Sequence, residues 1–514
     1  MNIRDPLYGD VQIDRNYEDI IHSGLFRRLM NVGMGSGKQW VFPSANFTRF
    51  EHCIGVYHLA EAVSGKLRCY SAGGALRKAE EEFKYANIDF EEHMNALKLV
   101  ALLHDIGHLP FSHVLEFALQ FFGEKEVEIA GKKLSSGGLH EKLGYAYLTD
   151  ASFREDVAVR CDLGEESLFP DLDFNDSLNY LLKSTLGGEE VRESEHLYLK
   201  QLIDGFMDID RIDHLSRDAF FTGVPVFTTD PETFISSYIL LWDKAMGGYH
   251  LSIDMNALAY VIGMLVGREL LYEAVYTHPK VRGFEMMLSR VFYSIYKDDR
   301  DLLSRIALLN DHEFLIALKR ELKEQKKEKE MKMLGDILKG NIYDVILEVR
   351  FHHIRDLLRE NWEFKEKLSE EMGEQSYQKL LDGFIEEYSN WEKIREKEEK
   401  LMEALKKEGL SDGDVFIYRD HTSDDPRKYL KLHKIGNVWL YDSRTKSYDF
   451  LYKIPWTKDV VEQWKNRWCI RIYVRDGKKG KVVRETAKRE LPWFEEILEL
   501  IERHNPPYPE YTNI

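Results

Sequence analysis

Cysteine is scarce in this chain, and the few cysteines are scattered. The 514 residues contain Cys53, Cys69, Cys161 and Cys469, with no CxxC spacing among them. This pattern argues against a disulfide framework and against a metal site made of thiolates. Reduced thiols fit a cytoplasmic protein, and we expect that location.

Long apolar runs are missing as well. No window approaches the roughly 18 uninterrupted apolar residues that a membrane span needs. The opening MNIRDPLYGD also lacks the basic and then apolar stretches of a signal peptide. We therefore expect no membrane partner. Apolar residues still make up 44% of the chain, which is enough to bury a large core.

Positive charge is in short supply. The chain has 71 Lys and Arg residues against 89 Asp and Glu residues, which gives a net charge of -18. Such a surface repels nucleic-acid phosphates, so nucleic-acid binding requires a local basic patch. The run from Lys323 to Lys332 is a candidate, although interleaved Glu residues offset much of its charge. A divalent cation in a pocket is another way for an acidic protein to attract a polyphosphate.

Helical periodicity dominates the first part of the chain. Apolar residues recur at helical spacing from about residue 15 to residue 315, as in MNALKLVALLHDIG, and we interpret 1–315 as one helical domain. The segment 316–410 is so rich in Lys and Glu that it predicts exposed helices, with a basic ligand contact as the alternative. No fixed-period repeat is visible.

The pattern changes after about residue 411 to short β-branched and aromatic runs separated by turns. These runs are DVFIYRD, NVWLYDS, YDFLYKI and WCIRIYVRD, and helices are predicted around VVEQWKNRW and WFEEILELIERH. They predict a small α+β element with one sheet over 411–514. The predicted fold class is therefore mainly α, with this element at the C-terminal end.

One His-Asp dipeptide stands out, in LVALLHDIGHLPFSH. An apolar helix there presents His104 and Asp105, followed by His108 and His113. We predict that His104 and His108 share a helix face and that Pro110 ends the helix. Taken alone the pair is a weak signal, because a core histidine bonded to a neighbouring carboxylate is the commoner arrangement.

Two other segments complete a possible metal site. RFEHCIGVYHLA supplies His52 on a second helix, and MDIDRIDHLSRD supplies Asp210 on a third. Two imidazoles and two carboxylates suit one divalent ion such as Mn, Fe, Zn, Ni or Mg, with coordination positions left open. The interior of a helical bundle is a usual place for such sites.

Several ordered blocks resemble the HD-domain dNTP triphosphohydrolases. The blocks are DPLYGDVQIDRNYEDIIHSGLFRRL, VFPSANFTRFEHCIGVYHLA, HDIGHLPFSH, LHEKLGYAYL, DIDRIDHLSRDAFFTGV and LLYEAVYTHPKVRGFE. The C-terminal pattern is similar too. The resemblance implies a helical HD-domain bundle that hydrolyses a (deoxy)nucleoside triphosphate to nucleoside and triphosphate. It also implies assembly into homodimers or tetramers.

The same resemblance implies roles for individual residues. The metal ligands are His52, His104, Asp105 and Asp210. The catalytic residues are His108, His113, His140 and Glu116, with Glu116 in place of the family's aspartate. Arg49 and Arg211 contact phosphate, and Asp218 lies near the sugar. The charges of Lys280 and Arg282 add two candidates for neutralising a polyphosphate.

Departures from the family pattern keep the substrate open. Met34 takes the place of a glutamine that helps distinguish deoxyribose from ribose. The mammalian member of the family has a tyrosine at the position of His214 and an arginine near His278, so both remain candidate substrate contacts of altered type. The stretch 71–93 is a candidate insertion. Another nucleotide or phosphoester is one alternative, and a regulatory module that senses a nucleotide or binds nucleic acid is another.

Overall fold

The computed structural model describes most of the chain. The described residues are 1–70, 76–86, 88–162, 169–170, 172, 174–188, 196–226, 230–243, 248–350, 373–419, 438–442, 444–445, 447–454, 468–492 and 494–504. Among these residues, no helix is long and apolar enough to cross a membrane.

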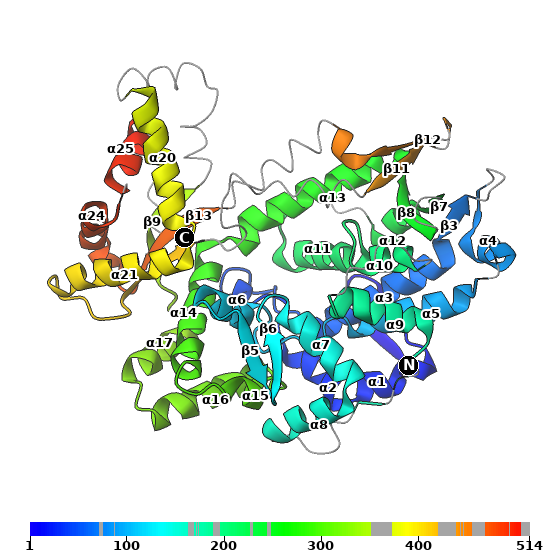
Figure 1. Ribbon diagram of the computed structural model, residues 1–514, viewed down its shortest axis with the longest axis horizontal. Coiled ribbons are helices and arrows are strands. Elements are labelled where there is room, and N and C mark those ends of the chain that lie inside the picture. The colour runs from blue at the N-terminus through cyan, green and yellow to red at the C-terminus, as the bar shows by residue number, and fades with distance from the viewer. Residues whose placement is uncertain are drawn as a thin grey trace.

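Helices form the body of the molecule, which confirms the predicted fold class (Figure 1). Up to residue 306 they are α1 (Glu18–His22), α2 (Gly24–Arg27), α3 (Arg49–Lys66), α4 (Ala79–Ala86), α5 (Phe90–Leu103), α6 (Val114–Phe121), α7 (Leu139–Thr149), α8 (Ala151–Arg160), α9 (Asp176–Leu181), α10 (Leu197–Ile203), α11 (Ile209–Thr222), α12 (Pro231–Ile235), α13 (Leu258–Leu271), α14 (Pro279–Tyr296) and α15 (Leu302–Ile306). Two π-helical turns, Leu182–Leu186 and Tyr272–Tyr276, continue α9 and α13.

Further helices follow in the charged region and near the C-terminus. They are α16 (Asp311–Glu324), α17 (Glu328–Leu338), α20 (Glu374–Tyr388), α21 (Trp391–Lys406), α24 (Gly480–Glu490) and α25 (Phe494–His504). The short 3-10 turns are Arg15–Tyr17, Arg28–Asn31, Lys38–Trp40, Met255–Ala257, Leu451–Lys453 and Gly477–Lys479. The helix predicted in WFEEILELIERH is thus confirmed as α25.

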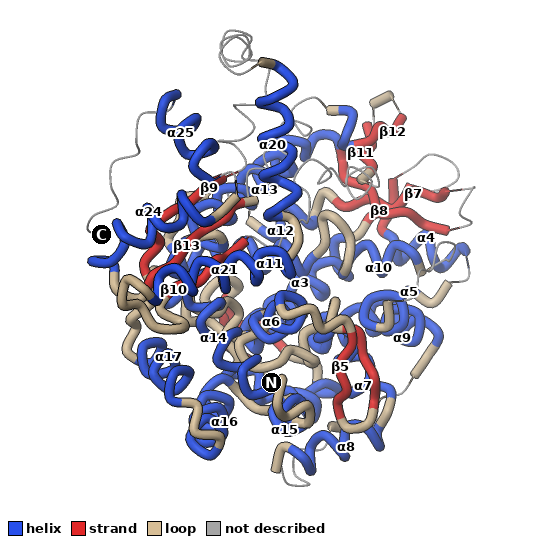
Figure 2. The backbone as a smooth tube through the Cα atoms, turned by 60° about the vertical axis from the view of Figure 1, so that its left-hand side comes forward, coloured by secondary structure: helices blue, strands red, loops and turns tan. Residues whose placement is uncertain are grey.

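The strands form two hairpins and two larger sheets, which Figure 2 shows well apart from one another. The hairpins are β1 (Asn2–Asp5) with β2 (Gly9–Gln12), and β5 (Glu126–Ile129) with β6 (Lys132–Ser135). The antiparallel three-stranded sheet has the order β10 (Val415–Arg419), β13 (Cys469–Val474), β9 (Asp344–Arg350). The six-stranded sheet has the order β12 (Ser447–Phe450), β11 (Trp439–Asp442), β8 (Gly248–Asp254), β7 (Tyr238–Asp243), β3 (Arg68–Tyr70), β4 (Leu76–Lys78).

The prediction of one small sheet over 411–514 is wrong. β10 and β13 pair with β9 from the charged region, whereas β11 runs parallel to β8 and extends a sheet of the first half. An edge strand offers unpaired backbone groups to any partner that reaches it, so strand partners are decided by long-range packing. The helix predicted around VVEQWKNRW lies almost entirely outside the described residues, and the boundaries at 315 and 410 stay predictions.

The hydrophobic core is divided to match these sheets. One large cluster runs through α3, α5, α6 and α14 and includes Val56, Leu103 and Phe292, all fully buried. A second cluster joins β10 and β13 to α20, α21 and α25, with Phe384 and Ile417 at its centre. The candidate site depends on the first cluster, in which α3 packs against both α5 and α11.

The start of α3 is set by its own sequence. Thr48 is the N-cap, and a capping box links it to Glu51, whose side chain accepts the Thr48 backbone N–H. Such a box satisfies donors that the first turn leaves free and fixes where the helix begins. Arg49 and His52 therefore lie on the first turn of α3, at its packed end.

Candidate metal centre

Three helices bring the four predicted metal ligands together. His52 lies on the first turn of α3 and Asp210 on the first turn of α11, where Asp208 caps the helix by accepting the Arg211 backbone N–H at 2.7 Å. His104 follows the last residue of α5, and Asp105 is next to it. Residues 158 positions apart in the sequence thus meet in one place.

The end of α5 differs from the prediction. The helix stops at Leu103, and residues 104–108 form a turn in which His108 Nε2 lies 3.1 Å from Asp105 Oδ1. The prediction that His104 and His108 share a helix face is therefore wrong. Gly107 weakens helix formation, and Pro110 disfavours a helical backbone in the residue before it, so the chain leaves the helix early.

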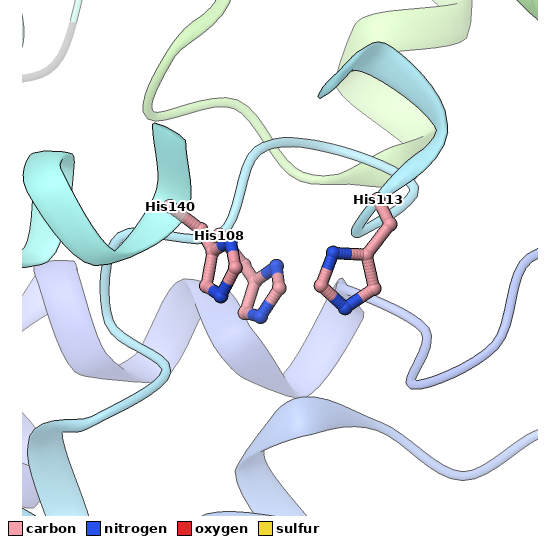
Figure 3. A group of neighbouring side chains, drawn as sticks. All are labelled: His108, His113 and His140. Atoms are coloured by element: carbon pink, nitrogen blue, oxygen red, sulfur yellow. The ribbon is translucent and has the colours of Figure 1, made fainter. Parts of the chain in front are cut away.

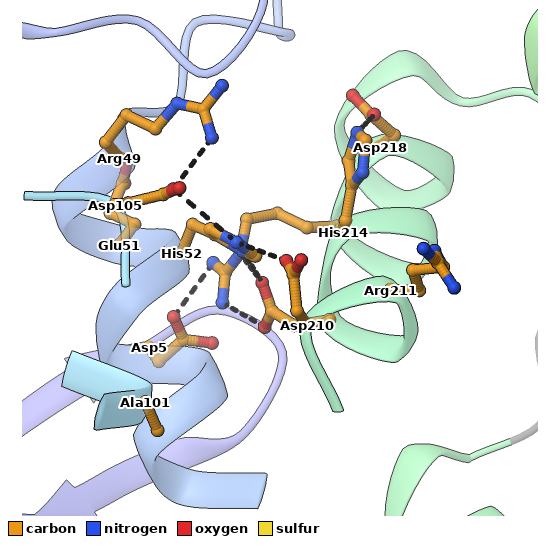
Figure 4. Close-up of polar contacts among 12 residues, drawn as sticks. Asp5, Arg49, Glu51, His52, Ala101, Asp105, Asp210, Arg211, His214 and Asp218 are labelled. Carbon is orange, nitrogen blue, oxygen red and sulfur yellow. Dashed lines mark hydrogen bonds and ion pairs between the residues drawn. The ribbon is translucent and has the colours of Figure 1, made fainter. Parts of the chain in front are cut away.

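The ligand atoms of His52, Asp105 and Asp210 lie close to one another (Figure 4), and His104 Nε2 lies beside that of His52. His52 Nε2 lies 2.9 Å from Asp210 Oδ1 and 3.2 Å from His104 Nε2. His104 Nε2 is 3.7 Å from the same Asp210 oxygen and 3.6 Å from Asp105 Oδ1. His52 is fully buried, whereas the side chain of Asp210 is 37% exposed, so the group of donors is open to solvent on one side.

The hydrogen bonds behind the two imidazoles show that the group suits a cation. His104 Nδ1 lies 2.9 Å from the Ala101 carbonyl oxygen, and His52 Nδ1 lies 2.7 Å from Asp213 Oδ2. Both acceptors require a proton on Nδ1, which leaves the lone pair on each Nε2. In the neutral imidazoles both Nε2 lone pairs are then available to one divalent ion, and the two Nε2 atoms lie 3.2 Å apart.

The electrostatics agree with this fit. Burial by itself lowers the pKa of His52, but the hydrogen bonds to Asp210 and Asp213 raise it to about 9. The site therefore favours positive charge at the position of Nε2 even where no metal ion supplies it. A metal ion would replace that proton, as is usual for histidine ligands.

A row of buried charged side chains contacts the Nδ1 side of His52. Asp213 accepts two hydrogen bonds from Arg217, at 2.8 and 2.9 Å, and Arg217 Nη1 donates to Asp5 Oδ2 at 2.9 Å. Arg217 and Asp213 are fully buried. A Cβ at Gly55 of α3 would lie 2.0 Å from Asp213 Oδ1, so only glycine lets the pair approach the helix. The orientation of His52 thus depends on an ion-pair network that begins near the N-terminus.

Arg49 orients Asp105, as Asp213 orients His52. Its Nη1 donates to Asp105 Oδ2 at 2.7 Å, and its Nε donates to Ser112 Oγ at 3.0 Å. Burial raises the pKa of Asp105, but the charges of Arg49 and the neighbouring histidines hold it well below its ordinary value. Asp105 is therefore an ionised carboxylate directed at the other ligands.

The loop after the His-Asp pair is held in an unusual backbone conformation. Phe111 and Ser112 have φ angles of 57° and 55°, which residues other than glycine seldom adopt. Asp311 of α16 accepts the backbone N–H of Phe111 at 2.6 Å and that of Gly33 at 3.0 Å. Ser112 Oγ donates to the Gly33 carbonyl at 2.6 Å. These bonds fix the direction in which the chain enters α6, whose N-cap is His113.

Three further histidines gather beside the metal ligands (Figure 3). His113 Nδ1 lies 3.1 Å from Glu116 Oε2, and His140 Nδ1 lies 2.7 Å from Glu116 Oε1. Burial raises the pKa of Glu116, but His140 and His113 hold it well below its ordinary value, so the carboxylate is ionised. Both Nδ1 atoms therefore donate to Glu116 and leave each Nε2 free.

These histidines are arranged for hydrogen bonding and proton transfer more than for holding a second ion. Possible ligand atoms of His108, His113 and His140 lie within 4.8 Å of one another. The rings of His108 and His140 are stacked, however, with centroids 4.2 Å apart and planes 13° from parallel. The lone pair of an imidazole lies in the ring plane, so two stacked rings cannot both direct one at the same ion. Glu116 raises the pKa of His140 against the effect of burial, which favours the protonated imidazole.

Three of the predicted substrate contacts, Arg211, His214 and Asp218, lie on α11 but on two different sides of the helix. His214 and Asp218 follow Asp210 at intervals of four residues and share its helix face. Arg211 bonds to the Gly205 carbonyl and lies 3.3 Å from Asp208, and Figure 4 shows it directed away from His52. In this conformation Arg211 is not placed to touch a group bound at the metal ligands.

Three predicted contacts lie near the N-terminus of α14 instead. His278 is the N-cap of that helix, and Arg282 is paired with Glu285 at 2.7 Å. Lys280 lines a separate cavity of about 580 Å³ together with Asp336 and Arg475. His278 Nδ1 accepts the backbone N–H of Lys280 at 3.2 Å, so the contacts described for these residues lie around the start of α14 and its neighbouring cavity.

Sequence reasoning missed several residues that support the site. Asp213 and Arg217 stand inside the block that supplied Asp210, at intervals of three and seven residues, so helical spacing places them on neighbouring faces. Lys38 and Asp311 gave no signal, because their partners are 180 and 200 residues distant. The predicted residues are therefore those with candidate ligand or catalytic groups, and the missed ones are partners that bond to them.

The fold and these side chains define a helical protein with a candidate metal centre of histidine and carboxylate groups. Residues 49–218 match the model of the HD domain, and residues 241–408 match that of the HD associated region. The chain therefore contains the HD domain that the resemblance of its motifs predicted, followed by the HD associated region.

Some of the relatives that resemble the chain are named as enzymes, and others are uncharacterised. A protein of Dictyostelium discoideum called a deoxynucleoside triphosphate triphosphohydrolase SAMHD1 homolog is 24% identical over 354 residues, which are 68% of this chain and 60% of that protein. An uncharacterised protein of Methanocaldococcus jannaschii is 28% identical over 291 residues, 56% of this chain and 48% of the other. The chain spans about half to three fifths of the length of such curated relatives, since the matched segments cover 48%, 60% and 60% of three of them.

Two solved structures share the fold over nearly the whole chain. A hypothetical protein from Aquifex aeolicus is 22% identical with a TM-score of 0.58, covering 95% of this chain and 99% of that one. A phosphohydrolase from Bacteroides thetaiotaomicron is 16% identical with a TM-score of 0.58, covering 93% and 100%. At these identities the likeness establishes the fold alone.

Proposed function

We propose that this chain is a nucleotide phosphohydrolase that uses one divalent metal ion and converts a (deoxy)nucleoside triphosphate to nucleoside and triphosphate. One observation carries the proposal: two imidazole nitrogens and two carboxylates converge from three helices, with a second group of histidines beside them. The Dictyostelium relative and similar amphibian and bovine proteins are named as deoxynucleoside triphosphate triphosphohydrolases or their homologs. These names support a deoxynucleoside triphosphate as the substrate.

His52, His104, Asp105 and Asp210 would hold the ion. When bound, the ion supplies Lewis-acid chemistry, which lowers the pKa of a water and offsets charge that develops on phosphate. The open side near Asp210 leaves room for a phosphate group. The metal is one of Mn, Fe, Zn, Ni or Mg, since all accept this set of ligands.

The surrounding cations of the chain would bind and orient the phosphates. Arg49 is held beside Asp105 by two hydrogen bonds, and its guanidinium grips phosphate oxygens in a fixed geometry. His140, whose protonated form Glu116 favours, lies next to His113 with ring centroids 4.9 Å apart and would add a second positive group. Arg211, His278, Lys280 and Arg282 would need to change conformation to take part.

His113 is the proposed general acid. Its side chain is 60% exposed, and Glu116 accepts from its Nδ1, so the imidazolium form of His113 would give its Nε2 proton to the leaving oxygen. His108, held by Asp105 and stacked on His140, keeps this group of rings together.

We expect His113→Ala to lower kcat about a hundredfold or more while metal content stays constant, because general acid catalysis contributes effects of that size. The loss should shrink for a nucleoside p-nitrophenyl phosphate, whose leaving group needs little protonation. Steady-state rates on both substrates are the measurement. The exposed His312→Ala serves as control, and equal losses on both substrates would remove the proton-transfer role.

A metal-supplemented screen tests the function itself. Purified protein is incubated with each dNTP, each NTP and several phosphomonoesters, and products are resolved by ion exchange. We expect nucleoside and inorganic triphosphate from at least one dNTP. Release of orthophosphate or pyrophosphate would place the cleavage at another phosphorus, and silence across the panel would favour the alternative of a nucleotide-sensing or nucleic-acid-binding regulator.

Assembly and location remain part of the proposal. Soluble enzymes of this size commonly form symmetric homo-oligomers, and the resemblance implies dimers or tetramers. We expect a cytoplasmic protein that takes a nucleotide as substrate and needs no membrane. Light scattering during size-exclusion chromatography measures the oligomeric state.

A further inference from the structure

A buried carboxylate, Asp218, lies on the same face of α11 as the metal-ligand candidate Asp210, eight residues further along the helix. Asp210, His214 and Asp218 lie at intervals of four residues on one face of α11. His214 is one third exposed, and its ring lies 6.3 Å from that of His52. Asp218, one turn further on, is fully buried. The residues around Asp218 therefore decide whether it can bind a substrate.

Three side chains of the protein already occupy the Asp218 carboxylate. Lys38 Nζ donates to Oδ1 at 2.6 Å. The Tyr276 hydroxyl donates to Oδ2, and His214 Nε2 lies 2.8 Å from the same oxygen. Burial raises the pKa of Asp218, but Lys38 and His214 hold it well below its ordinary value, so these donors face an ionised group.

The side chain of Lys38 is held beside Asp218 by aromatic rings and by the shape of its own loop. Its side chain is 5% exposed, and Nζ lies over the rings of Tyr276 and Phe47, 4.7 and 5.7 Å from their centroids. A Cβ at Gly35 would lie 2.1 to 2.5 Å from the end of the Lys38 side chain, so glycine at 35 is what makes room for it. The ammonium group is thus enclosed by one carboxylate and two aromatic faces.

A buried pair of this kind is hard to open. Removing either charge leaves the other desolvated and unpaired, which costs far more than an exposed pair is worth. The side chain of Asp218 is 0% exposed beneath these donors, so a substrate hydroxyl reaches it only when Lys38, His214 or Tyr276 moves away. An uncharged hydroxyl makes a weaker bond to a carboxylate than an ammonium group does, so the exchange is unfavourable.

We propose that Lys38 determines the sugar selectivity of this site by closing Asp218 to the substrate. The proposal rests on the nucleotide phosphohydrolase function proposed above. Asp218 then acts as a support that orients His214 and Tyr276, and the enzyme does not read the 3′-hydroxyl of its substrate through this carboxylate. Lys38 is a positioning residue, since it acts through Asp218.

A matched pair of substrates tests this directly. The 2′-deoxy and 2′,3′-dideoxy triphosphates of one base differ only in the 3′-hydroxyl, and kcat/KM is measured for both. We expect values within about threefold for the wild type, because no charged acceptor is free. A hydrogen bond to a charged group changes such ratios by roughly tenfold or more. A wild-type preference of that size for the deoxy substrate would overturn the proposal.

Variants then test the role of Lys38 itself. In Lys38→Met one oxygen of Asp218 becomes free, and the preference for the deoxy substrate should rise to about tenfold. Adding Asp218→Asn to Lys38→Met should remove most of the new preference. Tyr276→Phe, which keeps the ring beneath Lys38 but removes one donor, should shift the ratio in the same direction as Lys38→Met. An unchanged ratio in folded Lys38→Met or in Tyr276→Phe contradicts the proposal.

Failure of this inference can be distinguished from failure of the proposed function. If neither triphosphate is hydrolysed, the proposed function fails, and equilibrium binding of the same pair to metal-loaded protein gives the ratio in place of kcat/KM. A binding ratio within threefold that rises in the variants supports the role of Lys38. Hydrolysis of both substrates with a tenfold wild-type preference for the deoxy substrate would contradict the role of Lys38 alone. Absence of binding would contradict both that role and the proposed function.

Discussion

His104→Ala is expected to remove the bound metal and to lower phosphohydrolase turnover about a thousandfold or more. Metal ions contribute several kcal/mol to such reactions, and about 4 kcal/mol corresponds to that factor. His104 is the best ligand to replace, because its only other polar contacts within the described residues are the Ala101 carbonyl, His52 and two carboxylates of the site. Its loss therefore leaves the fold intact.

Metal content is measured by mass spectrometry on protein purified under identical conditions, and turnover is measured on the substrate that the screen identifies. Asp105→Asn provides a second ligand change that keeps the side-chain volume next to Arg49. The exposed Asp156→Ala is the control for general effects of losing a carboxylate, since its side chain is 46% exposed. Full turnover in His104→Ala with metal retained would show that this set of four residues is not the active centre.

Arg217→Met is expected to destabilise the protein by about 3–5 kcal/mol, since it leaves two buried carboxylates without their cation. Arg217 is fully buried and bonds to both Asp213 and Asp5, which are 0% and 2% exposed as side chains. The His52 imidazole then lies beside an unpaired Asp213. Weaker metal binding should accompany the lower stability, because partners behind a ligand commonly change affinity by about 10- to 100-fold.

Denaturant unfolding of the metal-free protein measures the first effect, and titration of the folded variant with metal measures the second. Arg160→Met is a matched control, because Arg160 pairs with Asp156 and Asp301 on the surface and is 38% exposed. Exposed pairs are worth at most about 1 kcal/mol. Equal destabilisation in the two variants would mean that the Asp5–Arg217–Asp213 chain adds nothing specific.

The ligands were predictable because they stand in short blocks whose order is distinctive. HD, RFEH and DIDR each place a ligand next to residues that start or end a helix, and the structure brings all three together. The end of α5 at Leu103 was not predicted, since the helix breakers in the sequence, Gly107 and Pro110, both stand after that residue. Local propensity differs by about 1 kcal/mol for a glycine, which tertiary packing easily outweighs.

The substrate side of the site was predicted less well. His278, Lys280 and Arg282 carry suitable charges in one short segment, yet Arg282 is paired with Glu285 and Lys280 lines a different cavity. Charge in a sequence indicates that a residue can bind phosphate, but not which way its side chain points. The direction is set by neighbours such as Asp336 and Arg475, far away along the chain.

The sequence by itself determined the helical class, the family and the four residues that offer ligand atoms to a metal, because helix periodicity and capping are properties of neighbouring residues. Only the tertiary structure decided that Lys38 neutralises Asp218, that Arg217 joins Asp5 to Asp213, and that β11 extends the sheet of β8. Each of these pairings joins segments between 180 and 212 residues apart. A buried charge or an edge strand needs some partner, but many segments can meet that need, and the packing of the whole chain selects one.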